Sequence, residues 1–131
     1  MAWRVVGAIC AVLAGTVLEG CVTAGPGRSD KEVVSQRAQE RWGLLVKNDF
    51  AGAYQYLSPA SRVVVKPDAY AGGFRSNFWT DAKVGDVSCG TPDACEVDVW
   101  VEYQHRGLKM RSPVHEKWIR QGSNWWFVLE R

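Results

Sequence analysis

A strict alternation of residue types runs through the middle of the second half of this chain. Its apolar positions are Cys95, Val97, Val99, Val101 and Tyr103, and the positions between them are Glu96, Asp98, Trp100, Glu102 and Gln104. Successive side chains of a strand point to opposite faces, so the pattern predicts a strand with one buried and one wet face. Such a strand belongs in an antiparallel sheet, and another part of the chain must cover its apolar side.

Three more strands are predicted around this one. Gly85 indicates a bulge or a close backbone approach in the strand before it. Pro113 lies in the strand that follows and places that strand at an edge or at a bulge, because proline has no N–H to donate to a sheet ladder. The last strand is apolar on both faces and should be covered on both. The predicted strands are 82–89, 95–104, 109–120 and 125–130, with turns at Arg106-Gly107 and 121–124.

Helices should precede the sheet. Ser29 and Glu32 form a capping-box pattern, which predicts that a helix starts there and ends near Lys47. Its apolar stripe consists of Val34, Ala38, Trp42 and Leu45, at helical spacing. Asp49 can cap a short second helix, Ser58-Pro59 restarts the chain, and a third helix is expected over 68–74. The predicted fold class is α+β, with N-terminal helices packed on a four-stranded antiparallel meander.

The N-terminal segment resembles an export signal. Arg4 precedes a charge-free apolar run from Val5 to Leu18, which is shorter than the about 20 residues of a membrane-spanning helix. Leu18-Glu19-Gly20-Cys21 is similar to the lipobox of bacterial lipoproteins, although Glu19 departs from that pattern. The resemblance implies a signal peptide over 1–20, lipidation of Cys21 with a flexible linker over 21–29, and a folded domain over 30–131. An ordinary secretory signal or an uncleaved anchor remains an alternative.

Lipidation would set both the location and the first partner of the chain. Two or three acyl chains on Cys21 would hold it stably to a membrane. Val22 after the cysteine implies, by the same resemblance, sorting to an outer membrane with the domain facing the periplasm.

Cys89 and Cys95 flank a five-residue, turn-forming loop. The ends of a hairpin loop lie opposite each other, so a disulfide is the expected state in an oxidising compartment. Two alternatives stay open at this point. The thiols could be free, or they could be half of a zinc site with His105 or His115 as further ligands, although the spacing matches no known finger or ribbon pattern.

The order of these elements resembles the nuclear transport factor 2-like superfamily, which has a cystatin-like, cone-shaped α+β fold. The resemblance rests on the segments 41–54 and 56–59, a helix that carries Tyr70, and a meander ending in Trp118-Ile-Arg-Gln-Gly-Ser-Asn-Trp125-Trp126. It implies a curved sheet wrapped around a long first helix, with a pocket between them. The superfamily includes isomerases, dehydratases, polyketide cyclases and binding or dimerisation modules, so fold does not decide function.

Enzymes of that superfamily place an acid or base in an apolar pocket, where burial can tune its pKa. Glu116 is the best candidate here, because it shares a strand face with Val114 and Trp118, and His115 and His105 follow. His115 falls on the opposite face, and a surface carboxylate and exposed imidazoles are the alternatives. Six aromatic residues could line a pocket or pack the core: Tyr54, Tyr70, Trp79, Tyr103, Trp118 and Trp126.

These patterns favour a non-catalytic, membrane-tethered binding domain for an envelope protein or a small apolar ligand. A pocket enzyme is the second hypothesis, and a module that dimerises through Trp100 is the third. No cofactor or metal is predicted. The net charge of +2 comes from scattered basic residues, which gives no nucleic-acid footprint.

Overall fold

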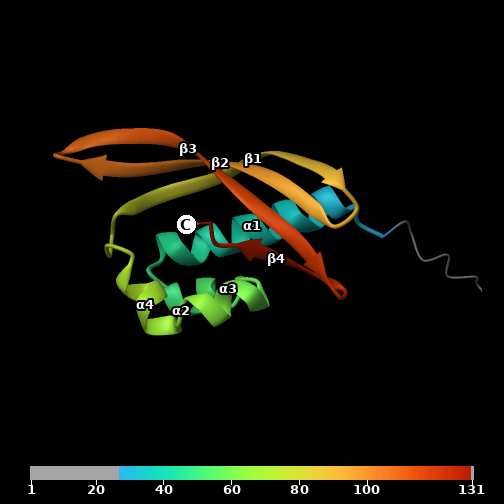
Figure 1. The fold of residues 1–131 in the computed structure, drawn as a ribbon. Coiled ribbons are helices and arrows are strands. Elements are labelled where there is room, and N and C mark those ends of the chain that lie inside the picture. The colour runs from blue at the N-terminus through green and yellow to red at the C-terminus, as the bar shows by residue number, and fades with distance from the viewer. Residues whose placement is uncertain (1–26, 131) are drawn as a thin grey trace, which may run out of the picture.

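The computed structural model describes residues 27–130, so the signal segment and Cys21 lie outside the described residues. Four antiparallel strands form one sheet in the order β1-β2-β3-β4, as a simple meander (Figure 1). They are β1 (Trp79–Thr91), β2 (Ala94–His105), β3 (Leu108–Gln121) and β4 (Asn124–Val128). The predicted α+β class and the antiparallel meander are confirmed. β1 begins three residues before its predicted start at Ala82.

The alternation in β2 gives the sheet its two faces. Cys95, Val97, Val99 and Val101 are buried, whereas Glu96 and Trp100 are exposed. All four helices lie on the side of the sheet toward which these valines point (Figure 1). The core therefore forms between the inner face of the sheet and the helical layer.

The first helix, α1 (Asp30–Val46), begins at the predicted capping box. The Ser29 side chain accepts a hydrogen bond from the Glu32 backbone N–H, and the Glu32 carboxylate accepts one from the Ser29 N–H. Val34, Ala38, Trp42 and Leu45 are buried as the spacing predicts. A fifth residue, Arg41, is buried with them.

Three short helices follow: α2 (Phe50–Tyr54), α3 (Pro59–Val64) and α4 (Pro67–Gly72). Asp49 and Ser58 cap the first two by accepting hydrogen bonds from the N–H groups of Gly52 and Ser61. The segment before α3 also extends the sheet, because Leu57 forms a parallel bridge with Phe127. The sequence gives no sign of this bridge.

Two sheet irregularities fall where the sequence places them, and two further register shifts of β1, between Trp79 and Asp81 and between Ser88 and Thr91, were not predicted. The register of β1 on β2 shifts between Val84 and Val87, around Gly85. Pro113 pairs with Trp100 of β2, whereas β4 pairs only with Lys117–Gln121, so Pro113 lies on a free edge among the described strands.

The last strand ends at Val128, two residues before its predicted end, and it also differs in its burial. The side chains of Trp125 and Phe127 are buried, but Trp126 and Val128 on the other face are only half-buried. The prediction that β4 is covered on both faces is therefore wrong for the face that carries Trp126 and Val128. Within residues 27–130, no helix has the length and apolar character needed to cross a membrane.

Candidate functional site

Glu116 lies inside the molecule, beneath α1. Glu116 as a whole residue is 5% exposed, and three side-chain donors surround its carboxylate. Oε1 accepts hydrogen bonds from Arg41 Nη1 at 2.6 Å and from Trp42 Nε1 at 2.6 Å. Oε2 accepts a hydrogen bond from Trp118 Nε1 at 3.0 Å. The carboxylate thus joins α1 to β3 and does not lie on the surface.

Arg41 completes this interior polar cluster. Its Nη2 donates to the Tyr70 hydroxyl at 3.1 Å, and its Cζ lies 3.7 Å from the centroid of the Phe127 ring. Burial raises the pKa of the Tyr70 hydroxyl above its usual value, and the positive charge of Arg41 partly opposes this rise. The Nε atom of Arg41 has no hydrogen-bond partner among the described residues.

Arg41 was not predicted to be buried, although the sequence contains a signal for it. Val34, Ala38, Arg41 and Leu45 are separated by four, three and four residues, so Arg41 stands in the middle of the apolar stripe. A charged residue in such a position is seldom buried without a partner. The buried face of β3 supplies that partner in Glu116.

The arrangement around Glu116 suits a structural role better than proton transfer. A general acid or base must come within hydrogen-bond reach of a substrate. Both oxygens of Glu116 are already bonded, and its side chain is 3% exposed. A cavity of about 190 Å³ borders Glu116, but its other lining residues include Glu96, Asp98 and Lys117 of the outer face. The carboxylate bonds on the inner face, toward α1.

The two histidines lie apart from this cluster. His115 is exposed on the outer face, and its Nδ1 lies 2.5 Å from Oδ1 of Asp98, its partner across the β2–β3 ladder. His105 is exposed at the end of β2. Glu116 and His115 point to opposite sides of the sheet, so these two groups cannot act on one substrate.

The six candidate aromatic residues pack against other rings or against cations. Tyr54, Tyr70 and Trp118 are buried, and Trp79, Tyr103 and Trp126 are half-buried. Ring pairs with centroids between 5.4 and 6.0 Å apart hold five of them: Tyr54–Tyr70, Trp42–Trp79, Trp79–Tyr103 and Trp118–Phe127. The guanidinium groups of Arg37 and Arg62 lie 5.5 and 5.2 Å from the centroid of the Trp126 ring. Trp100 is 41% exposed on the outer face, with Arg111 over its ring.

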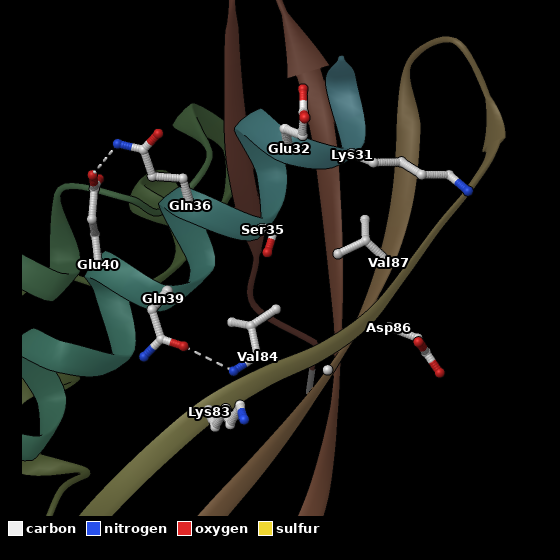
Figure 2. A pocket seen from close by; sticks show the side chains of 11 residues that line it. Lys31, Glu32, Ser35, Gln36, Gln39, Glu40, Lys83, Val84, Asp86 and Val87 are labelled. Atoms are coloured by element: carbon white, nitrogen blue, oxygen red, sulfur yellow. Dashed lines mark hydrogen bonds between the residues drawn. The ribbon is translucent and has the colours of Figure 1, made fainter. Parts of the chain in front are cut away.

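An open groove of about 710 Å³ lies between α1 and the edge of the sheet, where Figure 2 shows it. The side chains of Val84 and Val87 point from β1 toward the helix, and the Ser35 hydroxyl points from the helix into the space between them (Figure 2). The residues that line the groove come from two stretches of the chain: Lys31, Glu32, Ser35, Gln36, Gln39 and Glu40 of α1, and Lys83, Val84, Gly85, Asp86 and Val87 of β1.

Gln39 makes the most specific contact in this groove. Its Nε2 donates to the backbone oxygen of Ala82 at 2.9 Å, and its Oε1 accepts from the backbone N–H of Val84 at 2.9 Å. One side-chain amide thus bonds two successive edge groups of β1. None of the candidate residues taken from the sequence lines this groove, because a helix face and a distant strand edge form it together.

The thiols of Cys89 and Cys95 form a disulfide across the β1–β2 turn. This confirms the predicted crosslink, and the free-thiol and zinc alternatives are wrong. The described residues contain no group of three or more His, Cys, Asp or Glu side chains that could hold a metal ion.

Comparison with known proteins yields structural likeness alone. No protein-family model matches the chain, and no curated protein matches it either. Similar solved structures include two SEC-C motif-containing proteins, one from Rhodopseudomonas palustris and one from Psychrobacter arcticus, and an NTF2-like transpeptidase from Campylobacter jejuni.

The three likenesses are alike in strength, at 12% sequence identity each. For the R. palustris protein the TM-score is 0.58, with 71% of this chain and 73% of that one covered. For the P. arcticus protein it is 0.62, with 77% and 60% covered, so the chain spans less than two thirds of that protein. For the C. jejuni protein it is 0.54, with 72% and 96% covered. Together with the helices packed on a curved four-stranded sheet, they show a nuclear transport factor 2-like α+β fold and nothing about activity.

Proposed function

We propose that this chain is a lipid-anchored binding domain of the bacterial cell envelope, and that it holds its ligand in the groove between α1 and β1. The observation that carries the proposal is the bonding of Glu116. Three hydrogen bonds from Arg41, Trp42 and Trp118 occupy its carboxylate inside the cone. Because these bonds already occupy its carboxylate, Glu116 is a poor ligand contact, which favours binding in the outer groove.

The groove has the properties of a binding site. Val84 and Val87 give it an apolar floor, and Ser35, Gln36 and Gln39 add hydrogen-bonding groups at its helical wall. Ligand sites combine mostly apolar walls with a few placed polar groups, and their volumes are of order 300–1,000 Å³. Its volume of about 710 Å³ falls within that range.

Anchoring through Cys21 rests on the lipobox resemblance, and two features of the described chain accord with it. The predicted linker leads directly to the capping box at Ser29, where the folded part begins. The disulfide between Cys89 and Cys95 suits an oxidising compartment outside the cytoplasm. We propose the outer membrane, with the domain facing the periplasm, as its location.

The anchor can be tested on the chain as cells produce it. Mass spectrometry of the mature protein should find acyl chains on an N-terminal Cys21. A Cys21→Ser variant should lose the lipid and leave the membrane fraction. A mature chain with a plain amine at its N-terminus, or one that retains residues 1–20, would contradict the anchoring proposal.

The groove can be tested separately with a variant that fills it. Ser35→Arg places a long side chain in the groove, whereas Gln55→Arg, at the exposed C-terminal end of α2 and outside the groove lining, serves as the matched control. Native mass spectrometry of the full chain against fractionated envelope metabolites and peptides should find a ligand that Ser35→Arg excludes and Gln55→Arg retains. Equal binding to both variants, or turnover of the bound compound, would contradict the proposal.

A further inference from the structure

We propose that the ligand of the α1–β1 groove is an extended, uncharged segment of a partner polypeptide, which binds by adding a strand to the free edge of β1. This inference rests on the proposed function, because it names the ligand class of the same groove. It follows from the backbone geometry of β1, the contact made by Gln39 and the shape of the groove.

The first step is the free edge. β1 is the end strand of the sheet, so it pairs with β2 on one side and with no other described strand on the opposite side. The exposed edge of a strand carries a row of N–H and C=O groups that can pair with another chain. The groove runs along this edge from Lys83 to Val87.

The side-chain carboxamide of Gln39 occupies the place that a peptide group of a neighbouring strand would take. A neighbouring strand would accept from one edge N–H and donate to an edge oxygen nearby, and the Gln39 amide does both with Val84 and Ala82. In an antiparallel pair the N–H and C=O of one residue point to the same side. The carbonyl of Val84 therefore also faces the groove, next to the end of the Gln39 amide.

The third step is the bulge after Val84. The register shift around Gly85 inserts an extra residue, so Val84 and Val87 point to the same side, toward α1. An added peptide would find these two valines beneath it and the Ser35 hydroxyl beside it. At about 3.3 Å per residue, the stretch from Lys83 to Val87 accommodates roughly four or five peptide residues, which must displace the Gln39 amide from the Ala82 oxygen and the Val84 N–H or pair beyond it.

The lining also bears on the chemistry of the peptide. Charges of both signs surround the groove, with Lys31 and Lys83 against Glu32, Glu40 and Asp86. Glu32 is already engaged in the capping box, and Glu40 accepts from Gln36 and Tyr56. These charges sum to −1, which is too little to select a strongly charged peptide, whereas the valine floor favours small apolar side chains at alternate positions.

A second copy of this chain fits the groove less well than a single strand. The β1 edge of a second copy would bring its own α1 and its own Gln39 to the same space. This is the reason to prefer a partner segment over self-association.

The test uses backbone methylation, which distinguishes strand addition from other kinds of binding. Random dodecapeptides displayed on phage are selected on the immobilised full chain carrying Cys21→Ser, with the Ser35→Arg chain for counter-selection. Selected peptides are synthesised with N-methyl groups on either the odd or the even residues. Their affinities are measured by fluorescence anisotropy.

Strand addition predicts that methylation of one set weakens binding about tenfold or more, while methylation of the other set has little effect. Only alternate N–H groups of an added strand point to β1, so methylation of only one set removes hydrogen bonds to it. Equal effects of the two sets would overturn the inference but leave the groove as a binding site. If no peptide is selected, or if sedimentation shows a dimer that Ser35→Arg dissociates, the inference also fails.

Discussion

The guanidinium of Arg41 and the carboxylate of Glu116 meet at 2.6 Å in the interior, although 75 residues separate them in sequence. Their side chains are 4% and 3% exposed. The pair joins the second half of α1 to β3 in the interior. The two buried charges form an ion pair that connects the helical layer to the sheet.

Breaking this pair should destabilise the protein strongly. Glu116→Gln leaves the buried guanidinium of Arg41 without an opposite charge, and the expected loss in the free energy of unfolding is about 3 kcal/mol. Urea denaturation followed by tryptophan fluorescence measures it. The double variant Arg41→Met, Glu116→Gln should lose less than the sum of the two single variants, because neither charge is then left unpaired. Additive losses would show that the two groups do not interact.

The buried hydroxyl of Tyr70 should make stability fall in alkaline solution. Because its pKa is raised in the folded state, its contribution is fully present below the unfolded value near 10 and is lost as the pH rises through the folded value. Between these two values the free energy of unfolding should fall by up to about 1.4 kcal/mol per pH unit for this group. Urea denaturation between pH 9 and 11 measures the slope.

Tyr70→Phe is the matched control for this pH effect, because it keeps the ring and removes the proton. Its free energy of unfolding should depend less steeply on pH than that of the unmodified chain. Tyr56, whose pKa burial and Glu40 also raise, is present in both proteins, so its contribution cancels in the comparison. Identical slopes would mean that Tyr70 ionises as easily in the folded as in the unfolded chain.

Local patterns were sufficient to predict most of the fold. The capping box at Ser29, the stripe on α1 and the alternation in β2 each depend on residues close in sequence, and each is confirmed. The disulfide was equally accessible, because a short loop brings Cys89 and Cys95 together in any hairpin of this length. These features need no knowledge of how the helices pack on the sheet.

The candidate site depends on contacts that join distant segments, which explains why it was harder to predict. Glu116 was predicted from its position on a strand face. Its contact with Arg41, 75 residues earlier in the chain, could not be predicted in this way. The bond from Gln39 to Val84 spans 45 residues, and the parallel bridge between Leu57 and Phe127 also joins distant segments. Such pairs follow from the packing of α1 and from the end of the sheet, and neither can be read from periodicity.

Gln39 should protect the edge of β1 from local opening. Gln39→Ala removes two hydrogen bonds at 2.9 Å, so we expect a loss of roughly 1–2 kcal/mol in stability and faster hydrogen exchange at the Val84 amide. The amide of Val99, inside the sheet, should be affected only through the global loss. Gln36→Ala is the control on the neighbouring helix face, and it should leave the Val84 amide unchanged. Unchanged exchange at Val84 in Gln39→Ala would show that the contact does not protect the edge.

Reduction of the Cys89–Cys95 disulfide should lower the free energy of unfolding by about 2 kcal/mol. In the chain-entropy model a crosslink stabilises by restricting the unfolded chain, and closing so short a loop contributes near the lower end of the usual range. The measurement compares urea denaturation with and without dithiothreitol, in a chain whose Cys10 and Cys21 are replaced by serine.

The double variant Cys89→Ala, Cys95→Ala in the same background separates the crosslink from the reagent. Its stability should not respond to dithiothreitol, and it should lie at or below that of the reduced chain, because Cys95 is 1% exposed and its sulfur fills part of the core. Since the constraint acts on the unfolded state, the reduced chain should also expose more surface on unfolding and show a slightly steeper denaturant dependence. An unchanged urea midpoint after complete reduction would show that the hairpin is held by its strands and by the packing of Cys95 and Val97, with no contribution from the crosslink.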